Sequence, residues 1–268
     1  MKIIDRGSGT PVVVIPGIQG RWEWMAPAVA ALAQRCRVIT FSLADEPFSG
    51  GRFDESRGFW CYVEQVREAL DAAGVREASI CGVSYGGLIA AAFAARHPDR
   101  ASSLLLVSAL PPSWTPTARV RLLLRAPRLL TPLFLVAALR IFPEIAAASS
   151  GVTRGLLAAA RHLWRVATHL FSPVRMARRV RLLASVDLRP ELARITQPTL
   201  VITGEPSLDR VVPVQATLEY AHLLPHAGVA TIPRTGHLGL VTRPDEFARL
   251  VVTFAERAVH EGEARRVG

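Results

Sequence analysis

The chain has few of the residues and runs that mark secreted proteins. It contains three cysteines in 268 residues, Cys36, Cys61 and Cys81, which are odd in number and show no Cys-x-x-Cys spacing. This usage argues against a disulfide framework and against a zinc site, and it suits a reducing cytoplasm. No secretory signal is recognised, because the apolar run at residues 11–15 is too short and no cleavage-site pattern follows it. We therefore expect a cytoplasmic protein.

A long hydrophobic run is also missing. The longest apolar stretch, residues 129–142, contains Pro132 and Arg140. It is shorter than the roughly 20 residues that a helix needs to cross a bilayer, so it predicts a buried or interfacial helix. Half of all residues are apolar and 20% are charged. That composition is sufficient for a packed core and is unlike that of a disordered chain.

Lysine occurs once, at Lys2, so arginine carries nearly all of the positive charge. The net charge of +10 is concentrated between residues 111 and 190, where thirteen arginines accompany two acids. A basic segment of this kind is one mark of nucleic-acid binding. However, no RNP-type or zinc-finger pattern accompanies it, and leucine and alanine separate the arginines instead of tyrosine and phenylalanine. We expect no nucleic-acid partner and interpret the segment as a distinct module.

Outside this segment, short apolar runs alternate with amphipathic stretches. Strands that alternate with helices indicate βαβ units and a mostly parallel sheet. We expect residues 1–110 and 186–268 to form one α/β core, and residues 111–185, which show no strand pattern, to form a helical, arginine-rich insertion. Strands are predicted at residues 12–15, 37–41, 78–81, 103–108, 199–203 and 228–232, and helices at 26–34, 61–73, 88–96 and 245–260.

The strongest local motif lies at residues 80–88, which read Ile-Cys-Gly-Val-Ser-Tyr-Gly-Gly-Leu. An apolar strand runs through Gly-x-Ser-x-Gly into an alanine-rich helix, and the glycines leave room for a sharp turn with a strained Ser84 at its apex. Such a turn presents the hydroxyl as a nucleophile and puts the Tyr85 N–H at a helix N-terminus, where it can stabilise an oxyanion. The alternative is an ordinary glycine-rich turn, which the flanking strand and helix argue against.

A serine nucleophile needs a base, and the base needs an orienting acid. His237 follows the last predicted strand in a Thr-Gly-His loop from which an imidazole can reach Ser84. The other six histidines flank helix ends or lie in the basic segment or the C-terminal tail. Two acids follow the strand that ends at Thr203: Glu205, which is nearer the strand, and Asp209. Both are candidates for the acid.

The order Ser84, acid, His237, with a helical insertion before the acid, resembles that of the lidded α/β hydrolases, which include esterases, lactonases and C–C bond hydrolases. The resemblance covers nearly the whole chain. It implies an α/β-hydrolase fold and a triad in which Asp209 is the acid, because the Val-Val-Pro after it matches the family pattern. It also implies an oxyanion hole made by the Ile18 and Tyr85 amides, with no metal and no organic cofactor.

The chain departs from this family at three loops. Residues 16–20 read Pro-Gly-Ile-Gln-Gly where His-Gly is usual, and residues 42–50 lack the usual Asp-x-x-Gly-x-Gly-x-Ser pattern. The loop that carries Glu205 and Asp209 is about two residues longer than is common in the family. The residue at the turn, Ser84, argues against epoxide-hydrolase and haloalkane-dehalogenase chemistry, because those enzymes use a carboxylate nucleophile in this fold.

These features predict a serine hydrolase that cleaves a carboxylic ester, or a related acyl bond, of a small or medium apolar substrate. The insertion is expected to act as a lid, with Trp114 and Phe134 lining an apolar pocket; the alternative is that they only pack the lid on the core. Lid arginines could bind a substrate carboxylate or weakly contact an anionic membrane surface. A C–C bond hydrolase, a lactonase and a non-catalytic ligand receptor are the alternative functions.

Overall fold

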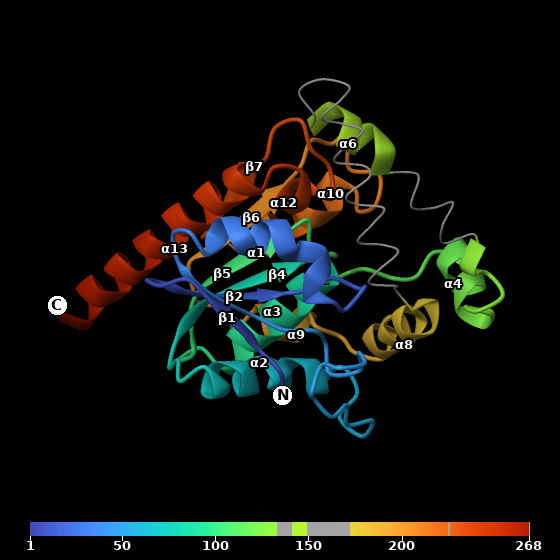
Figure 1. Ribbon diagram of the computed structural model, residues 1–268, viewed down its shortest axis with the longest axis horizontal. Helices are drawn as coiled ribbons and strands as arrows, with labels where there is room; N and C mark the ends of the chain where they lie inside the picture. Colours follow the sequence, from blue (N-terminus) through green and yellow to red (C-terminus); the bar gives the residue numbers. More distant parts are fainter. Residues whose placement is uncertain (133–140, 149–171, 225, 268) are drawn as a thin grey trace.

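The computed structural model describes residues 1–132, 141–148, 172–224 and 226–267. A seven-stranded sheet in the order β1-β3-β2-β4-β5-β6-β7 forms its centre (Figure 1). Strands β2 to β7 pair in parallel and β1 pairs antiparallel with β3, which confirms the mostly parallel α/β sheet. The strands are β1 (Ile4–Arg6), β2 (Pro11–Ile15), β3 (Arg37–Thr40), β4 (Ala78–Val83), β5 (Ala101–Val107), β6 (Thr199–Thr203) and β7 (Ala227–Thr231).

The central strands are continuous apolar runs because both faces of the sheet are covered. All six residues of β4 are buried, and so are the last four of β2. Parallel strands with two covered faces lose the polar–apolar alternation of half-exposed strands. Strand β1 was not predicted from the sequence, because it is a three-residue edge strand with the exposed polar residues Asp5 and Arg6.

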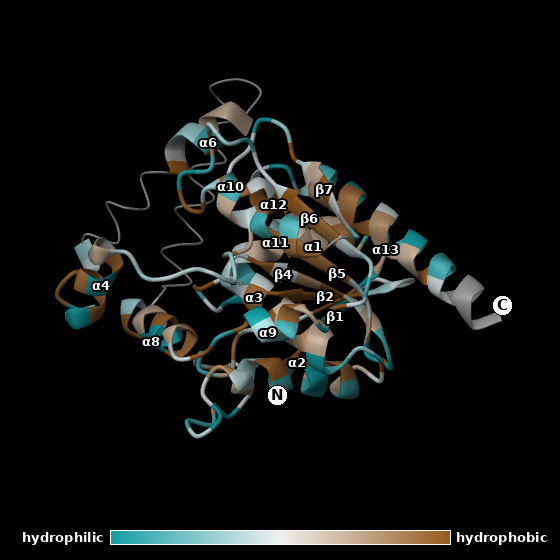
Figure 2. Ribbon diagram, turned by 180° about the vertical axis from the view of Figure 1, so that it is seen from behind, coloured by the Kyte–Doolittle hydropathy of each residue, from teal (hydrophilic) through white to brown (hydrophobic). Residues whose placement is uncertain are grey.

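Helices cover both faces of the sheet (Figure 1). Helices α2 (Trp60–Ala72) and α3 (Tyr85–Arg96) pack into one apolar cluster, while α1 (Ala26–Leu32) and α13 (Pro244–Val267) pack into the other. Figure 2 shows apolar strands between these layers and polar residues on outer turns of α2 and α13. Five short helices complete the core: η1 (Trp22–Met25), α9 (Arg189–Leu192), α10 (Val214–Thr217), α11 (Glu219–Leu223) and α12 (Gly239–Thr242).

The described part of residues 111–185 contains helices and no strand. These helices are α4 (Ala118–Arg125), α6 (Phe142–Ala148) and α8 (Pro173–Ala184), and Figure 1 shows them on the side away from the C-terminus. Thr117 and Ser172 cap α4 and α8 with side-chain oxygens that accept backbone N–H groups. The division into core and lid remains a prediction. No helix among the described residues is long and apolar enough to span a bilayer.

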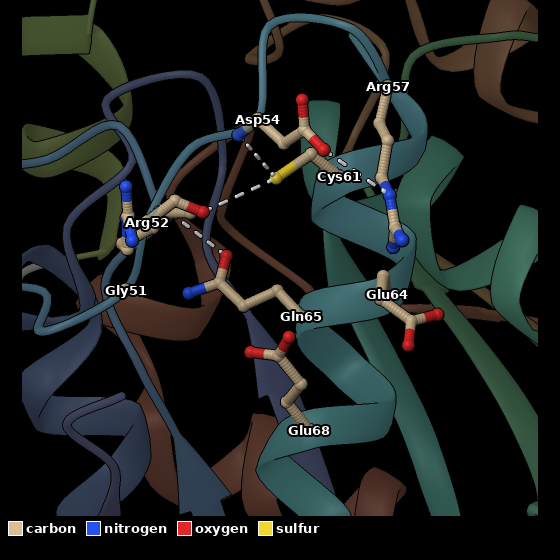
Figure 3. A pocket seen from close by; sticks show the side chains of 9 residues that line it. Gly51, Arg52, Asp54, Arg57, Cys61, Glu64, Gln65 and Glu68 are labelled. Carbon is tan, nitrogen blue, oxygen red and sulfur yellow. Dashed lines mark hydrogen bonds and ion pairs between the residues drawn. The ribbon is translucent and has the colours of Figure 1, made fainter.

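A buried glutamine on α2 holds the loop that follows β3. Gln65 Oε1 accepts the N–H of Ala44 at 2.9 Å, and its Nε2 donates to the Ser42 carbonyl at 2.9 Å. Figure 3 shows Gln65 directed from α2 toward this loop, at a surface pocket of about 220 Å³ between the two. Because the side chain is only 2% exposed, water cannot replace these two bonds. Gln65 therefore fixes the backbone of a loop whose sequence is unusual for the family that the chain resembles.

Replacing Gln65 with Met should lower the free energy of unfolding by about 2–4 kcal/mol. Two buried backbone groups then lose their partners, at about 1–3 kcal/mol each. Urea unfolding measures the loss. The control is Glu68→Met, one turn further along α2 at the same pocket, which should change the free energy by less than about 0.5 kcal/mol because Glu68 is exposed. Equal losses in the two variants would contradict the role given to Gln65.

Candidate active site

Ser84 lies at the apex of the turn between β4 and α3. Its φ of 52° and ψ of −115° fall in a region that non-glycine residues rarely adopt. The surrounding backbone holds this conformation: the Ser84 N–H donates to the Val107 carbonyl at 2.9 Å, and the Ser84 carbonyl accepts the N–H groups of Gly87 and Leu110. The structure thus has the strained strand–turn–helix geometry that the Gly-x-Ser-x-Gly motif predicts.

The start of α3 abuts the end of β2. A Cβ at Gly86 would lie 2.6 Å from the carbonyl oxygens of both Ile15 and Pro16, so only glycine permits this approach. As the first residue of α3, Tyr85 has an N–H without an intrahelical acceptor. The loop after β2 is in van der Waals range of the serine, since a Cβ on Gly17 would lie 3.5 Å from the Ser84 Cβ. Both predicted oxyanion-hole segments therefore flank the serine.

His237 lies in the loop between β7 and α12 and contacts Asp209, which follows β6. His237 Nδ1 is 3.3 Å from Asp209 Oδ2. The other oxygen of this carboxylate, Oδ1, accepts the N–H groups of Val211 at 3.0 Å and Val212 at 2.9 Å. Both side chains are buried, so the aspartate is held rigidly and faces the imidazole with its free oxygen.

The rival acid, Glu205, has a different partner. Its Oε1 accepts the backbone N–H of Arg234 at 2.7 Å, at the surface of the same loop. The two loops pack tightly, since a Cβ on Gly236 would lie 2.4 Å from the Leu208 carbonyl oxygen. The structure thus brings Asp209, and not Glu205, to the imidazole of His237.

These side chains share one edge of the sheet because the strands that precede them, β2, β4, β6 and β7, run in parallel. The carboxyl-terminal edge of such a sheet is where α/β proteins usually bind ligands. Ser84 Oγ has no hydrogen-bond partner among the described residues. Nucleophile–base bonds are often long before a substrate is bound.

Comparison with known proteins identifies the family of the chain. Residues 12–250 match the family model described as the alpha/beta hydrolase family. The chain belongs to the alpha/beta hydrolase family. A 2-hydroxymuconate semialdehyde hydrolase of Pseudomonas putida is 29% identical over 269 residues, which cover 95% of this chain and 90% of that protein. A pimeloyl-[acyl-carrier protein] methyl ester esterase of Aliivibrio salmonicida is 26% identical over 246 residues, which cover 90% of each chain.

Solved structures show the same fold. An esterase from Exiguobacterium antarcticum superposes with a TM-score of 0.79 at 20% sequence identity, over 95% of this hydrolase and 94% of that chain. An enol-lactonase from Burkholderia xenovorans gives a TM-score of 0.75 at 21% identity, over 94% and 95% of the two chains. At such identities the likeness concerns the fold. The expected α/β-hydrolase fold is thereby confirmed.

The sequence analysis of this hydrolase did not predict a buried ion cluster that Arg179 forms with Asp45 and Glu46, next to the loop that carries Ile18. Arg179 of α8 is fully buried, and its Nη2 donates to Asp45 Oδ1 and Glu46 Oε1, each at 2.6 Å. Burial disfavours the charge of Arg179, but Asp45 and Glu46 outweigh it, so the pKa of the guanidinium is raised. Arg175 adds a second cation, with its Nε 3.1 Å from Glu46 Oε1. Both acids belong to loop 42–50, and the unusual sequence of this loop was the feature that could have indicated the cluster.

Arg179 also reaches the loop that carries Ile18. Its Nη1 donates to the Ile18 carbonyl at 2.7 Å. On the other side, the Gly17 carbonyl accepts the Gly20 N–H at 2.9 Å, which fixes the plane of the peptide that carries the Ile18 N–H. Both peptide groups that flank Ile18 are therefore held in place, although the usual histidine of this loop is absent.

A second acid near the site was also missed by the sequence analysis. Glu144, on α6, accepts the N–H of Leu238 at 2.6 Å, next to His237. Its carboxyl is buried, and it is one of only two acids between residues 111 and 190. That scarcity was the signal that could have singled it out.

The predicted substrate-binding residues are only partly described. Trp114 is half-buried and packs against the apolar cluster of α2 and α3, while Phe134 lies outside the described residues. The arginines of α8 all have protein partners. Besides Arg175 and Arg179, Arg178 pairs with Glu55 and Arg181 donates to the Leu124 carbonyl.

The cysteines do not compete with Ser84 as nucleophiles. All three are free and buried, and burial raises the pKa of Cys36 to about 12 and also raises those of Cys61 and Cys81. A protonated thiol is a weak nucleophile. Among the described residues, no group of three His, Cys, Asp or Glu side chains is arranged to hold a metal ion.

Substituting Arg179 with Met should destabilise the fold by about 3–5 kcal/mol, because two buried carboxylates lose their main cation. The preceding residue supplies the control: Arg178→Met breaks a partly exposed pair with Glu55 and should cost less than about 1 kcal/mol. Chemical denaturation of both variants at neutral pH makes the comparison. If the two losses are alike, the buried cluster does not hold α8 against loop 42–50.

Proposed function

We propose that the chain is a serine hydrolase that cleaves a carboxylic ester, or a related acyl bond, of a small or medium apolar substrate. The observation that carries the proposal is the 3.3 Å contact between Asp209 Oδ2 and His237 Nδ1, at the sheet edge where Ser84 occupies its strained turn. A buried acid–imidazole pair and a strained serine at the same sheet edge are the groups that nucleophilic acyl transfer requires.

In the proposed mechanism, His237 Nε2 takes the proton of Ser84 Oγ while the oxygen attacks the substrate carbonyl carbon. Asp209 accepts the Nδ1–H bond and stabilises the imidazolium that forms. The imidazolium then gives its proton to the leaving alcohol, and an acyl-enzyme remains on Ser84. Water, deprotonated by His237, attacks the acyl carbon; the acid then leaves, and Ser84 Oγ takes the proton back from His237. Every step is a proton transfer or an acyl transfer.

The backbone N–H groups of Tyr85 and Ile18 would bind the oxyanion of the tetrahedral intermediates. The position of Tyr85 at the start of α3 supports this role, since the helix dipole favours negative charge there. The bonds that hold both peptide groups around Ile18 support the second donor. A donor fixed before the reaction is effective because it need not reorganise as charge develops.

Residues 111–185 would form a lid over this edge and select the substrate, with Trp114 at its junction to the core. A C–C bond hydrolase is the second candidate, because the relative from Pseudomonas putida is a 2-hydroxymuconate semialdehyde hydrolase. Each of the four arginines of α8 already bonds to a protein group, which supports an uncharged ester as the first candidate. The three free thiols suit a reducing cytoplasm.

Turnover screening separates the two candidates. p-Nitrophenyl esters of increasing chain length, a lactone panel and a ring-cleavage diketone are assayed side by side. We expect turnover of esters and little of the diketone. Diketone turnover well above that of every ester would assign the chain to the C–C hydrolases. Tight ligand binding without any turnover would instead indicate a receptor.

Replacing Ser84 with Ala should abolish ester turnover and leave the melting temperature nearly unchanged. Loss of a triad nucleophile costs several orders of magnitude in rate, whereas removing one small hydroxyl alters packing little. A fluorophosphonate probe measures this directly, because it should label the wild type and not the variant. Persistent labelling of Ser84→Ala would show that another residue is the nucleophile.

The Asp209→Asn variant should lower kcat by roughly 10⁴-fold, since the amide favours the wrong tautomer of His237. Glu205→Gln is the matched control and should change kcat little, because Glu205 bonds to the Arg234 N–H at the surface. Steady-state kinetics on the best ester of the screen gives both values. The reverse ranking would transfer the acid role to Glu205.

A further inference from the structure

Glu144 connects the insertion to the loop that carries the proposed base. The residue lies on α6, which precedes His237 by about ninety positions in the chain. Its Oε1 accepts the Leu238 N–H at 2.6 Å, and the Gly236 N–H lies close enough to lower the pKa of the carboxyl. The backbone directly after His237 is thus bonded to a side chain of α6. That side chain is 1% exposed, so the bond is shielded from solvent.

Asp209 and Glu144 bond to different groups of the loop that carries His237. Asp209 occupies Nδ1 of the imidazole, whereas Glu144 is bonded to the backbone next to the ring. Glu144 is therefore not a second triad acid. We propose that Glu144 is a positioning residue for His237: its ionised carboxylate holds the backbone at Leu238 and adds a buried negative charge that acts on the imidazole. This inference rests on the proposed function of Ser84 and His237.

The charge matters because His237 becomes positive when it accepts the serine proton. The buried Glu144 carboxylate interacts electrostatically with His237, so it stabilises that charge, and water screens it little. Hydrogen bonds from backbone N–H groups to a charged acceptor are also stronger than those to a neutral one. Both contributions require Glu144 to be ionised, so both should diminish as the carboxyl takes up a proton.

Glu144 titrates in the range where this effect is measurable. Burial raises its pKa to about 7, although the Gly236 and Leu238 N–H groups and His237 lower it. Asp209 raises it further by like-charge repulsion. In the described part of the chain, His237 and Asp209 are the titratable groups that act on it. The proposed assistance is thus present above about pH 7 and lost below it.

The same ionisation has the opposite effect on stability. A carboxyl whose pKa is raised in the folded state stabilises the fold fully only below its unfolded pKa, and this contribution is lost as pH rises through the folded value. The buried charge therefore costs stability at pH 8 while it assists catalysis. A residue that served only to pack α6 on the core would show no such opposition. The Glu144→Gln variant separates the effect of the charge from that of packing, because its amide oxygen can still accept the Leu238 N–H but carries no charge.

The test compares Glu144→Gln with the wild type by the rate of fluorophosphonate labelling between about pH 5 and 9. Above the pKa of Glu144 the wild type should react about fivefold to tenfold faster, the ratio expected when a charged acceptor is replaced by a neutral one. Below about pH 6 the two rates should converge, because both side chains are then neutral. Thermal unfolding at pH 8 should show the variant to be at least as stable as the wild type.

The control is Glu205→Gln, which also removes a carboxylate bonded to the backbone of this loop, but at the surface. Its labelling rate should follow the wild type at every pH. A pH-independent ratio for Glu144→Gln, or a variant that is less stable at pH 8, would overturn the proposal and leave a packing role. An unlabelled wild-type protein would instead overturn the proposed function of Ser84, which keeps the two failures distinct.

Discussion

The buried guanidinium of Arg179 is the interaction on which the site's geometry depends most. It joins α8, the loop after β3 and the loop after β2 in one cluster with Asp45 and Glu46. Ion pairs of this kind add little net stability, because desolvation offsets most of the attraction. Asp45 Oδ2 and Glu46 Oε2 lack hydrogen-bond partners among the described residues, which increases that cost. The cluster instead fixes the positions of the two loops relative to α8, because a misplaced loop would leave a buried charge unpaired.

Two helices of the basic segment, residues 111–190, therefore contact opposite parts of the proposed machinery. Helix α8 holds the carbonyl of Ile18, beside the proposed oxyanion hole, and α6 holds the backbone beside His237 through Glu144. Neither helix supplies a residue of the proposed triad. In both cases a charged side chain of the helix bonds a backbone group next to a proposed site residue.

The sequence analysis predicted what depends on local chemistry. Apolar runs identified the buried strands, and the glycines around Ser84 identified the strained turn, because both patterns lie in consecutive residues. Helix α3 nevertheless begins at Tyr85, three residues before the predicted start, since periodicity cannot locate a helix end within a glycine-rich turn. The choice between Asp209 and Glu205 rested on a family pattern. The contact with His237 depends on how two loops pack, which the sequence alone does not encode in any local signal.

The arginines show why contacts between distant segments could not be predicted from the sequence. Their excess within residues 111–190 indicated a basic module and raised the question of an external anionic partner. In α8 that charge is directed inward or along the surface to the chain's own acids, Glu46 and Glu55 among them. Both acids lie more than a hundred residues earlier, and Glu46 belongs to loop 42–50, which departs from the family pattern. The excess of arginine in residues 111–190 and the acids of loop 42–50 thus form ion pairs with each other. These pairs are seen only once the fold brings the two segments together.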